Sequence, residues 1–253
     1  MENVKEEKKA YMYKNLIDIT GSDIIGYFNY YDEMRERSEP PEFLSKIYRF
    51  SEFKDKKVLE IGCGNGYILS KYAKAGAECF GVDISEKAVE VSLERFKLER
   101  LIAKLKVAEA ENLPFEDNSF DLVCSMGVLH YTKDTQKAVK EIHRVLKPGG
   151  EAILMFYHKN SAQYRLFFPI QTLLKNKSRH ALLNETYNFK MPVNKVYAKS
   201  EVKKLMKDFK EVEIKIDFLP AHHFPLVWRF IPDGFFKPFS KWLGFKLYIS
   251  AEK

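Results

Sequence analysis

Apolar and polar positions follow two alternating periodicities between residues 56 and 157. Short apolar runs rich in β-branched residues predict buried strands at 57–62, 77–84, 103–110, 120–127 and 151–157. Amphipathic stretches between them predict helices at 66–76, 85–99 and 134–150, the last one stopped by Pro148 and the Gly149-Gly150 pair. Strict alternation of strand and helix predicts right-handed crossovers and a parallel, doubly wound sheet.

The flanking segments predict additions to this core. Residues 5–50 predict two or three helical pieces, broken at Pro40 and Pro41. A capped helix and a strand are predicted at 200–219 and a last strand at 244–253, which makes seven strands in all. We therefore expect a helical cap or lid over 1–54, a ligand-binding core over 55–157, and substrate-facing insertions plus the last two strands of the same sheet over 158–253.

Composition narrows the class of protein. The 253 residues are 45% hydrophobic and 30% charged, which is typical of a soluble α/β domain with additions. The N-terminus mixes charges of both signs without an apolar core, so we expect no secretory signal and a cytoplasmic location. Three cysteines without CxxC or Cys/His spacing predict neither a disulfide partner nor a metal site.

Charge and aromatic residues gather in the last two fifths of the chain. Residues 1–150 carry 24 Lys/Arg against 26 Asp/Glu, whereas residues 151–253 carry 18 against 9. The second part also holds both tryptophans and 12 of the 20 phenylalanines. The insertions at 158–199 and 220–243 therefore differ in character from the core.

A glycine-rich loop follows the first predicted strand in "KKVLEIGCGNGY". Gly62, Gly64 and Gly66 allow close approach of a ligand to the backbone. Asp83 ends the second strand 17 residues after the last glycine, where a carboxylate can accept hydrogen bonds from a ribose diol. The fingerprint GxGxxG of dinucleotide sites is broken by Tyr67, and no Lys-Ser/Thr pair forms a P-loop. Glu60 disfavours a pyrophosphate and suits a cationic ligand.

The motifs "VLEIGCGNG", "GVDIS", "AENLPFEDNSFDLV", "SMGVLHY" and "LKPGG" occur in that order. They resemble the successive motifs of class I S-adenosylmethionine-dependent methyltransferases, and most of all the small-molecule branch that includes ubiquinone and menaquinone C-methyltransferases. The resemblance covers residues 55–157, plus a tail at 200–219 and 244–253. It implies a Rossmann-like fold, S-adenosylmethionine as cofactor, and methyl transfer as the activity.

The resemblance also implies roles for matching positions. Glu60 and the loop of Gly62, Cys63, Gly64 and Gly66 would hold the methionine end of the cofactor, and Asp83 would hold the ribose. The adenine and amino group would be contacted by Ile84, Glu109, the backbone N–H of Ala110 and the backbone carbonyl of Ser125. Glu109 departs from the aspartate usual in the family, so the adenine is gripped differently or the longer side chain reaches the same atom.

Two residues are candidates for catalysis. His130 lies near the transferred methyl group in resembling enzymes, with Tyr131 beside it, and either could orient the acceptor or move a proton. The alternative is that both only cap the strand and shape the pocket floor. Tyr27 and Tyr31 fall on one helical face and predict a lid over the cofactor, with core packing as the alternative.

The acceptor is left open by the core motifs. The aromatic, basic insertions fit a lid over an apolar or anionic small molecule, a surface that touches a membrane, or a groove for RNA, and part of them fills a small second core. "SMGV" replaces the Asn/Asp-Pro-Pro-Tyr/Phe signature used on base nitrogens, so the sequence favours a small-molecule acceptor over nucleic acid. Transfer RNA methylation and a non-catalytic cofactor-binding subunit stay as alternatives.

Overall fold

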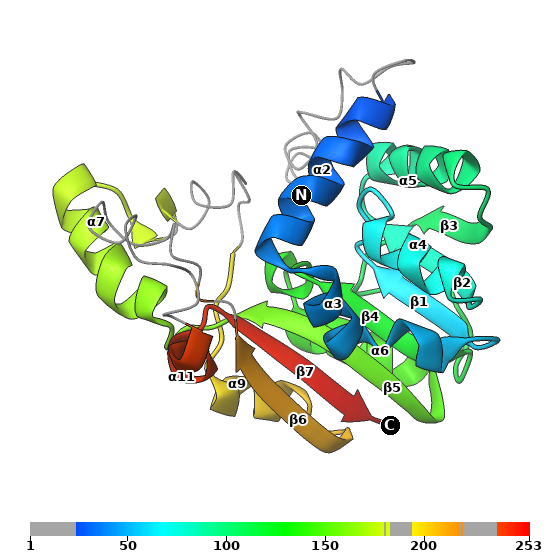
Figure 1. Cartoon of the computed structure of the whole chain (residues 1–253). Helices are drawn as coiled ribbons and strands as arrows, with labels where there is room; N and C mark the ends of the chain where they lie inside the picture. The colour runs from blue at the N-terminus through cyan, green and yellow to red at the C-terminus, as the bar shows by residue number, and fades with distance from the viewer. Residues whose placement is uncertain (1–23, 180, 183–193, 218, 220–236) are drawn as a thin grey trace.

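The computed structural model describes residues 24–179, 181–182, 194–217, 219 and 237–253. Its described strands form one seven-stranded sheet in the order β3-β2-β1-β4-β5-β7-β6 (Figure 1). They are β1 (Lys57–Ile61), β2 (Glu78–Asp83), β3 (Ala103–Val107), β4 (Phe120–Met126), β5 (Leu146–Tyr157), β6 (Lys210–Asp217) and β7 (Lys246–Glu252). Strands β1 to β5 pair in parallel, and β7 runs antiparallel to both β5 and β6. The predicted doubly wound, mostly parallel seven-stranded sheet is therefore confirmed.

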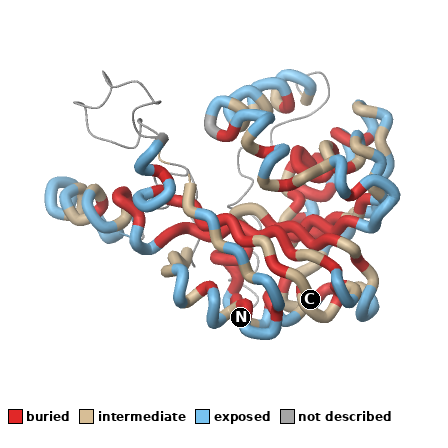
Figure 2. The backbone as a smooth tube through the Cα atoms, turned by 60° about the horizontal axis from the view of Figure 1, so that its bottom comes forward, coloured by how far each residue is buried: buried red, intermediate tan, exposed pale blue. Residues whose placement is uncertain are grey.

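Helices cover both faces of this sheet. The described helices are α2 (Ile24–Ser38), α3 (Pro41–Tyr48), η3 (Phe50–Phe53), α4 (Tyr67–Lys74), α5 (Glu86–Leu98), η4 (Leu129–Tyr131), α6 (Thr135–Val145), η5 (Gln163–Phe167), α7 (Phe168–Lys175), α9 (Lys199–Leu205), η8 (Lys237–Phe239) and α11 (Ser240–Leu243). Side chains of α3, α4 and α5 share one buried cluster with β1 and β4, and side chains of α6 and α9 share another. Figure 2 shows the sheet as a buried layer between more exposed helices.

Local sequence explains where these elements begin. The Ser85 hydroxyl accepts the backbone N–H of Ala88, and the Asp134 carboxylate accepts that of Lys137, so each caps a helix. Four of the five β1 residues are buried, as expected for a central parallel strand covered on both faces. The order of strands reverses between β1 and β4, and ligands in open parallel sheets bind at such a point, beyond the carboxyl ends of the strands.

One predicted boundary is wrong. The sequence predicts a helix that is stopped at Pro148 and a strand that starts at Glu151, but α6 ends at Val145 and β5 begins at once with Leu146. Residues 147–150 lie opposite Asp121 alone, because the register with β4 shifts there. A proline cannot donate to the strand ladder, so this bulge is where the sheet tolerates Pro148.

Candidate active site

The loop between β1 and α4 turns sharply at the carboxyl edge of the sheet. Gly62 and Gly66 have φ angles of 74° and 77°, where an L side chain is strained. A Cβ atom on Gly62 would lie 2.2 Å from Cγ2 of Val128, in the segment that follows β4. The N–H groups of Gly62 and Cys63 donate to the Val82 carbonyl at 2.7 and 3.1 Å. The loop is thus held against β2 on one side and against the β4 segment on the other.

Asp83 joins the end of β2 to the same loop. Its Oδ2 accepts the Gly64 N–H at 3.0 Å, and its Oδ1 accepts the Ser85 N–H at 2.9 Å. The residue is almost fully buried, and Ile84 next to it is half-buried. The two backbone hydrogen bonds therefore fix the orientation of this carboxylate at the carboxyl end of β2.

Glu60 lies buried inside β1, one residue before its end. Its Oε2 atom has no hydrogen-bond partner among the described residues. Burial raises the pKa of Glu60 to about 8, although the Arg35 guanidinium acts in the opposite direction. Because a buried acidic group with an unpartnered oxygen is costly, this residue is an unusual choice for a strand that only needs to pack.

Ser125 and Cys63 turn their side chains into the fold. The Ser125 hydroxyl donates to the Ile61 carbonyl at 3.0 Å and ties β4 to the end of β1. The Cys63 thiol is buried 3.8 Å from the Ser92 hydroxyl. All three cysteines are buried free thiols, and the described part of the chain contains no group of three His, Cys, Asp or Glu that is arranged for a metal ion. A ligand would therefore meet the backbone of Ser125 and Cys63, not their side chains.

Glu109 and Ala110 lie just beyond β3. The Ala108 N–H donates to the Asp83 carbonyl at 2.9 Å, which draws this segment against the end of β2. Ala110 is buried, and Glu109 forms an isolated bridge with Asn112. The fold thus places these two residues at the same sheet edge as Asp83, as an adenine site would require.

His130 and Tyr131 form most of η4, which follows β4. The His130 ring is fully buried, 4.2 Å from the Tyr131 ring and 4.1 Å from the Tyr157 ring, and both its nitrogens lack hydrogen-bond partners among the described residues. Burial lowers the pKa of His130 to about 3, so the imidazole is neutral near pH 7. The hydroxyls of Tyr131 and Tyr157 lie 3.3 Å apart.

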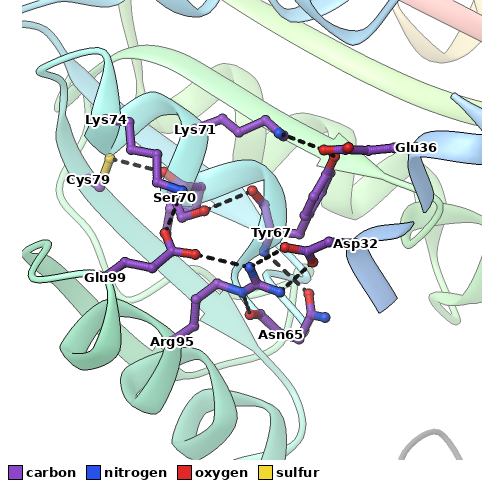
Figure 3. A network of polar contacts seen from close by, with 11 residues as sticks. Asp32, Glu36, Asn65, Tyr67, Ser70, Lys71, Lys74, Cys79, Arg95 and Glu99 are labelled. Atoms are coloured by element: carbon purple, nitrogen blue, oxygen red, sulfur yellow. Dashed lines mark hydrogen bonds and ion pairs between the residues drawn. The ribbon is translucent and has the colours of Figure 1, made fainter. Parts of the chain in front are cut away.

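Helix α2 is held onto the glycine loop by a polar network (Figure 3). Arg95 of α5 is buried, and two of its nitrogens donate to the Asp32 carboxylate at 2.7 and 2.9 Å. Its Nε donates to the Asn65 carbonyl at 2.8 Å, inside the loop. The Tyr67 hydroxyl at the start of α4 donates to Glu36 at 2.8 Å. Arg95 of α5 therefore contacts both α2 and the loop.

The two tyrosines predicted to share a face of this helix do so. The Tyr27 and Tyr31 rings lie 6.0 Å apart, and Tyr31 lies 6.4 Å from Tyr67. Burial raises the pKa of Tyr27 to about 12, and a hydrogen bond with the Asn65 side chain opposes that effect. Tyr30 points away and is exposed. These tyrosines lie against the loop, although the role of the helix as a cofactor lid stays a prediction.

Sequence reasoning missed Arg35, which continues the same face one turn later. Arg35 pairs with Glu39 at 2.9 Å and donates to the Met126 sulfur at the end of β4. Glu39 is buried and also pairs with Lys246 of β7 at 2.6 Å. The spacing of four residues from Tyr27 to Tyr31 to Arg35 is the signal that could have found it.

Comparison with known proteins gives a family match for part of the chain. Residues 59–154 match the family described as "Methyltransferase domain". The chain is 40% identical over 116 residues to tocopherol O-methyltransferase from Arabidopsis thaliana, covering 43% of this chain and 32% of that protein. It is 30% identical over 124 residues to ubiquinone biosynthesis O-methyltransferase from Coxiella burnetii, covering 49% and 53%. The chain thus spans about half or less of the length of these curated relatives.

Solved structures extend the similarity to most of the chain. The structure of a SAM-dependent methyltransferase from Aquifex aeolicus superposes with a TM-score of 0.55 at 16% identity, and the match covers 87% of this chain and 96% of that one. At this identity the comparison shows the fold alone. The match includes more than residues 59–154, so the fold is shared beyond the motif-bearing core.

Proposed function

We propose that the protein is a class I S-adenosylmethionine-dependent methyltransferase that transfers a methyl group to a small-molecule acceptor, and the match of residues 59–154 to the methyltransferase domain family supports this proposal. The observation that carries the proposal is Glu60, a buried acidic residue with an unpartnered oxygen beside a loop in which Gly62, Gly64 and Gly66 all have positive φ angles. A ligand with a positive charge near that oxygen relieves the cost of burying it. A pyrophosphate would add to that cost.

The residues present fit S-adenosylmethionine, which supplies a methyl group already bonded to a sulfonium leaving group. Glu60 and the loop of residues 62–66 would hold the methionine end, and Asp83 would accept hydrogen bonds from the ribose hydroxyls. Four further residues would complete the site: Ile84, Glu109, Ala110 and the backbone carbonyl of Ser125. Each of them lies at the carboxyl edge of β1 to β4.

The main task left to the protein is alignment of acceptor and methyl group in a site without water. Such alignment is worth about 7 to 11 kcal/mol in favourable cases. In this proposal His130 and Tyr131 orient the acceptor. The neutral imidazole can accept a hydrogen bond from an acceptor hydroxyl through its unprotonated nitrogen, whereas its lowered pKa of about 3 makes it a weak proton acceptor.

More specifically, we propose that the small-molecule acceptor is lipid-like. Tocopherol and ubiquinone name the acceptor class of two relatives. Here, the rings of His130, Tyr131 and Tyr157 pack in or against an apolar cluster next to the site, which suits an apolar molecule. Transfer RNA methylation and a non-catalytic cofactor-binding subunit are the alternatives that the experiment must exclude.

The test begins with ligand binding and ends with turnover. We expect S-adenosylmethionine and S-adenosylhomocysteine to raise the melting temperature and NAD to leave it unchanged. Asp83→Ala should weaken cofactor binding at least tenfold, since it removes the ribose acceptor, whereas His130→Ala should leave binding nearly intact. Labelled methyl should pass to a lipid-soluble or other small-molecule fraction of a lysate and not to total tRNA. A shift with NAD alone would refute the proposal, and labelled tRNA would favour the RNA alternative.

Domain division and location stay predictions. We propose that residues 1–54 act as a lid, 55–157 bind the cofactor, and 158–253 supply substrate-facing insertions along with the last two strands. Arg95 connects α2 to the loop through its hydrogen bonds with Asp32 and the Asn65 carbonyl, and this connection supports the first of these roles. Free, buried cysteines are consistent with a cytoplasmic protein. None of the described helices is long and apolar enough to cross a membrane.

A further inference from the structure

Several large aliphatic side chains on α7 and the turn before it face solvent. Leu173 is 85% exposed, and Leu166, Ile170 and Leu174 are each more than half exposed. Successive residues of an α-helix turn by roughly 100°, so Ile170, Leu173 and Leu174 share one narrow stripe. A surface helix normally turns such a stripe inward, so its exposure requires an explanation.

The inner side of the same helix shows that α7 is fixed in this orientation. Phe168 lies on the opposite side of α7 and is fully buried. It belongs to an apolar cluster that also contains Tyr157, Phe245 and Tyr131. Because α7 already buries an aromatic anchor, the stripe of Ile170, Leu173 and Leu174 forms its outer face. Figure 2 shows this projecting element, at the left, as largely exposed.

A second exposed apolar group stands at the same edge of the sheet. Tyr157 at the end of β5 pairs in register with Lys246 at the start of β7. The chain runs from Tyr157 toward α7 and from α11 to Lys246. Both connections therefore lie at the same end of the β5 and β7 pair (Figure 1). Trp242 of α11 is 69% exposed. This edge holds the carboxyl ends of the parallel strands, where the candidate active site also lies.

Charge and side-chain type indicate which partner fits the outer face of α7. The sequence has no Asp or Glu from residue 152 to 184, and Arg165 and Arg179 beside the helix are exposed. Cations around an apolar stripe are typical of helices that lie in the interface of an anionic bilayer, and tryptophan is enriched at that depth. RNA would favour exposed aromatic rings for stacking, whereas the exposed residues on α7 are aliphatic.

We propose that the outer face of α7, together with Trp242, docks onto an anionic lipid bilayer. The aliphatic side chains enter the headgroup and acyl boundary, and the arginines stay near the lipid phosphates. This docking turns the acceptor side of the site toward the membrane. The inference rests on the proposed function in one respect, because docking would serve to deliver a lipid-like acceptor. Docking itself needs neither cofactor nor turnover.

The test is sedimentation of the full chain with lipid vesicles in the absence of cofactor. We expect binding to vesicles made of equal parts phosphatidylcholine and phosphatidylglycerol, weaker binding to phosphatidylcholine alone, and loss of binding as salt rises. The double variant Leu173→Glu/Leu174→Glu should bind at least tenfold more weakly, because two apolar groups no longer enter the lipid. Ile102→Glu is the matched control, since Ile102 is also 85% exposed but lies beside β3 at the other end of the sheet.

Fluorescence gives a second measurement on the same surface. In a Trp228→Phe background, Trp242 is the remaining tryptophan. We expect its emission to shift to shorter wavelength when the mixed vesicles are added and to stay unchanged with the double glutamate variant. Equal vesicle binding by wild type and double variant would overturn the proposal.

Other occupants of the outer face give different results, and each would overturn the proposal. If another segment of this chain covers the face, the double variant melts well below the Ile102→Glu control. If a second copy covers it, light scattering shows a dimer that the variant abolishes. If RNA is the partner, tRNA binds and vesicles do not. Calorimetry with S-adenosylmethionine separates the two proposals, because cofactor binding with no vesicle binding refutes docking alone.

Discussion

At the scale of single residues, the burial of Glu60 affects how strongly the protein binds a cationic ligand. Its pKa is raised to about 8 mainly by burial, so in the free protein the carboxyl group is largely protonated at pH 6. A cationic ligand favours the carboxylate, so binding below pH 8 releases a proton. We expect the affinity for S-adenosylmethionine to rise up to about tenfold per pH unit between pH 6 and 8.

Calorimetry in two buffers of different ionisation enthalpy measures that proton directly. The Glu60→Gln variant should bind more weakly at pH 8 and should lose the extra pH dependence and the released proton. The variant also serves as the control for titration of the ligand's own amino group. A pH profile shared by both proteins would show that Glu60 does not face the cation.

Gly62 and Gly149 allow backbone strain to be separated from side-chain contact. Both have a φ of 74°, but a Cβ on Gly62 would lie 2.2 Å from Val128, whereas nothing lies within 4 Å of one on Gly149. Gly149→Ala should cost about 1 kcal/mol of unfolding free energy, from backbone strain alone. Gly62→Ala should cost at least about 2 kcal/mol more, because the contact must also be relieved.

Urea unfolding measures both costs, and a second substitution identifies the contact. Val128→Ala added to Gly62→Ala should recover part of the loss, while the same addition to Gly149→Ala should recover none. Equal losses for the two alanine variants would mean that the segment after β4 moves aside without cost.

At the scale of elements, the position of α2 depends on the Asp32 and Arg95 pair. Among the described residues, Asp32→Ala would leave the buried guanidinium with Glu99 at 3.2 Å and the Asn65 carbonyl as hydrogen-bond partners, beside the Phe28 ring at 4.2 Å. We expect faster amide hydrogen exchange across residues 24–38 and weaker cofactor binding, because the substitution removes the bidentate carboxylate partner of a buried guanidinium. Glu33→Ala is the control, since Glu33 pairs with Arg37 on the same helix but in solvent. Unchanged exchange in Asp32→Ala would show that apolar contacts alone hold the helix.

Prediction from sequence worked best for elements whose apolar residues recur at regular spacing. The alternation of apolar runs located β1, β2 and β4 because these strands are buried on both faces. It failed at the end of α6, where Leu146 keeps the helical period although its backbone already belongs to β5. The sequence also contains no local sign that Arg95 is buried, since its partners Asp32 and Asn65 come from segments 30 or more residues away.

At the scale of the whole molecule, the sequence predicts the residues of the candidate site in more detail than the segments around it. Motifs such as Gly62 and Asp83 occupy the ends of successive strands, so sheet topology alone brings them together. Arg35 was missed because its importance depends on β7, more than 200 residues later, and pairing at that range has no local signal. The acceptor was left open for the same reason, since the end of β5 before α7 and the start of β7 after α11 come together only through the pairing of Tyr157 with Lys246.

The buried contacts of Glu39 tie the N-terminal helices to the end of the chain. Glu39 pairs with Arg35 of α2 and with Lys246 of β7, and the Tyr248 hydroxyl donates to it. Burial alone would raise the pKa of Glu39, but the two cations outweigh burial and lower it to about 2. An acid with a lowered pKa stabilises the fold above its unfolded pKa of 4.5, and this contribution is lost as pH falls toward 2.

Glu39→Gln tests this linkage through the pH dependence of stability. The shift corresponds to about 3 kcal/mol of unfolding free energy at pH 7 and to roughly half of that at pH 3. Urea unfolding should therefore show a difference between wild type and Glu39→Gln that shrinks over this range, whereas the exposed Glu33→Gln should show almost none. Adding Lys246→Met to Glu39→Gln should recover stability at pH 7, because it removes the buried cation that the first substitution left unpaired. A difference that stays constant from pH 7 to 3 would mean that Glu39 contributes by packing and not by charge.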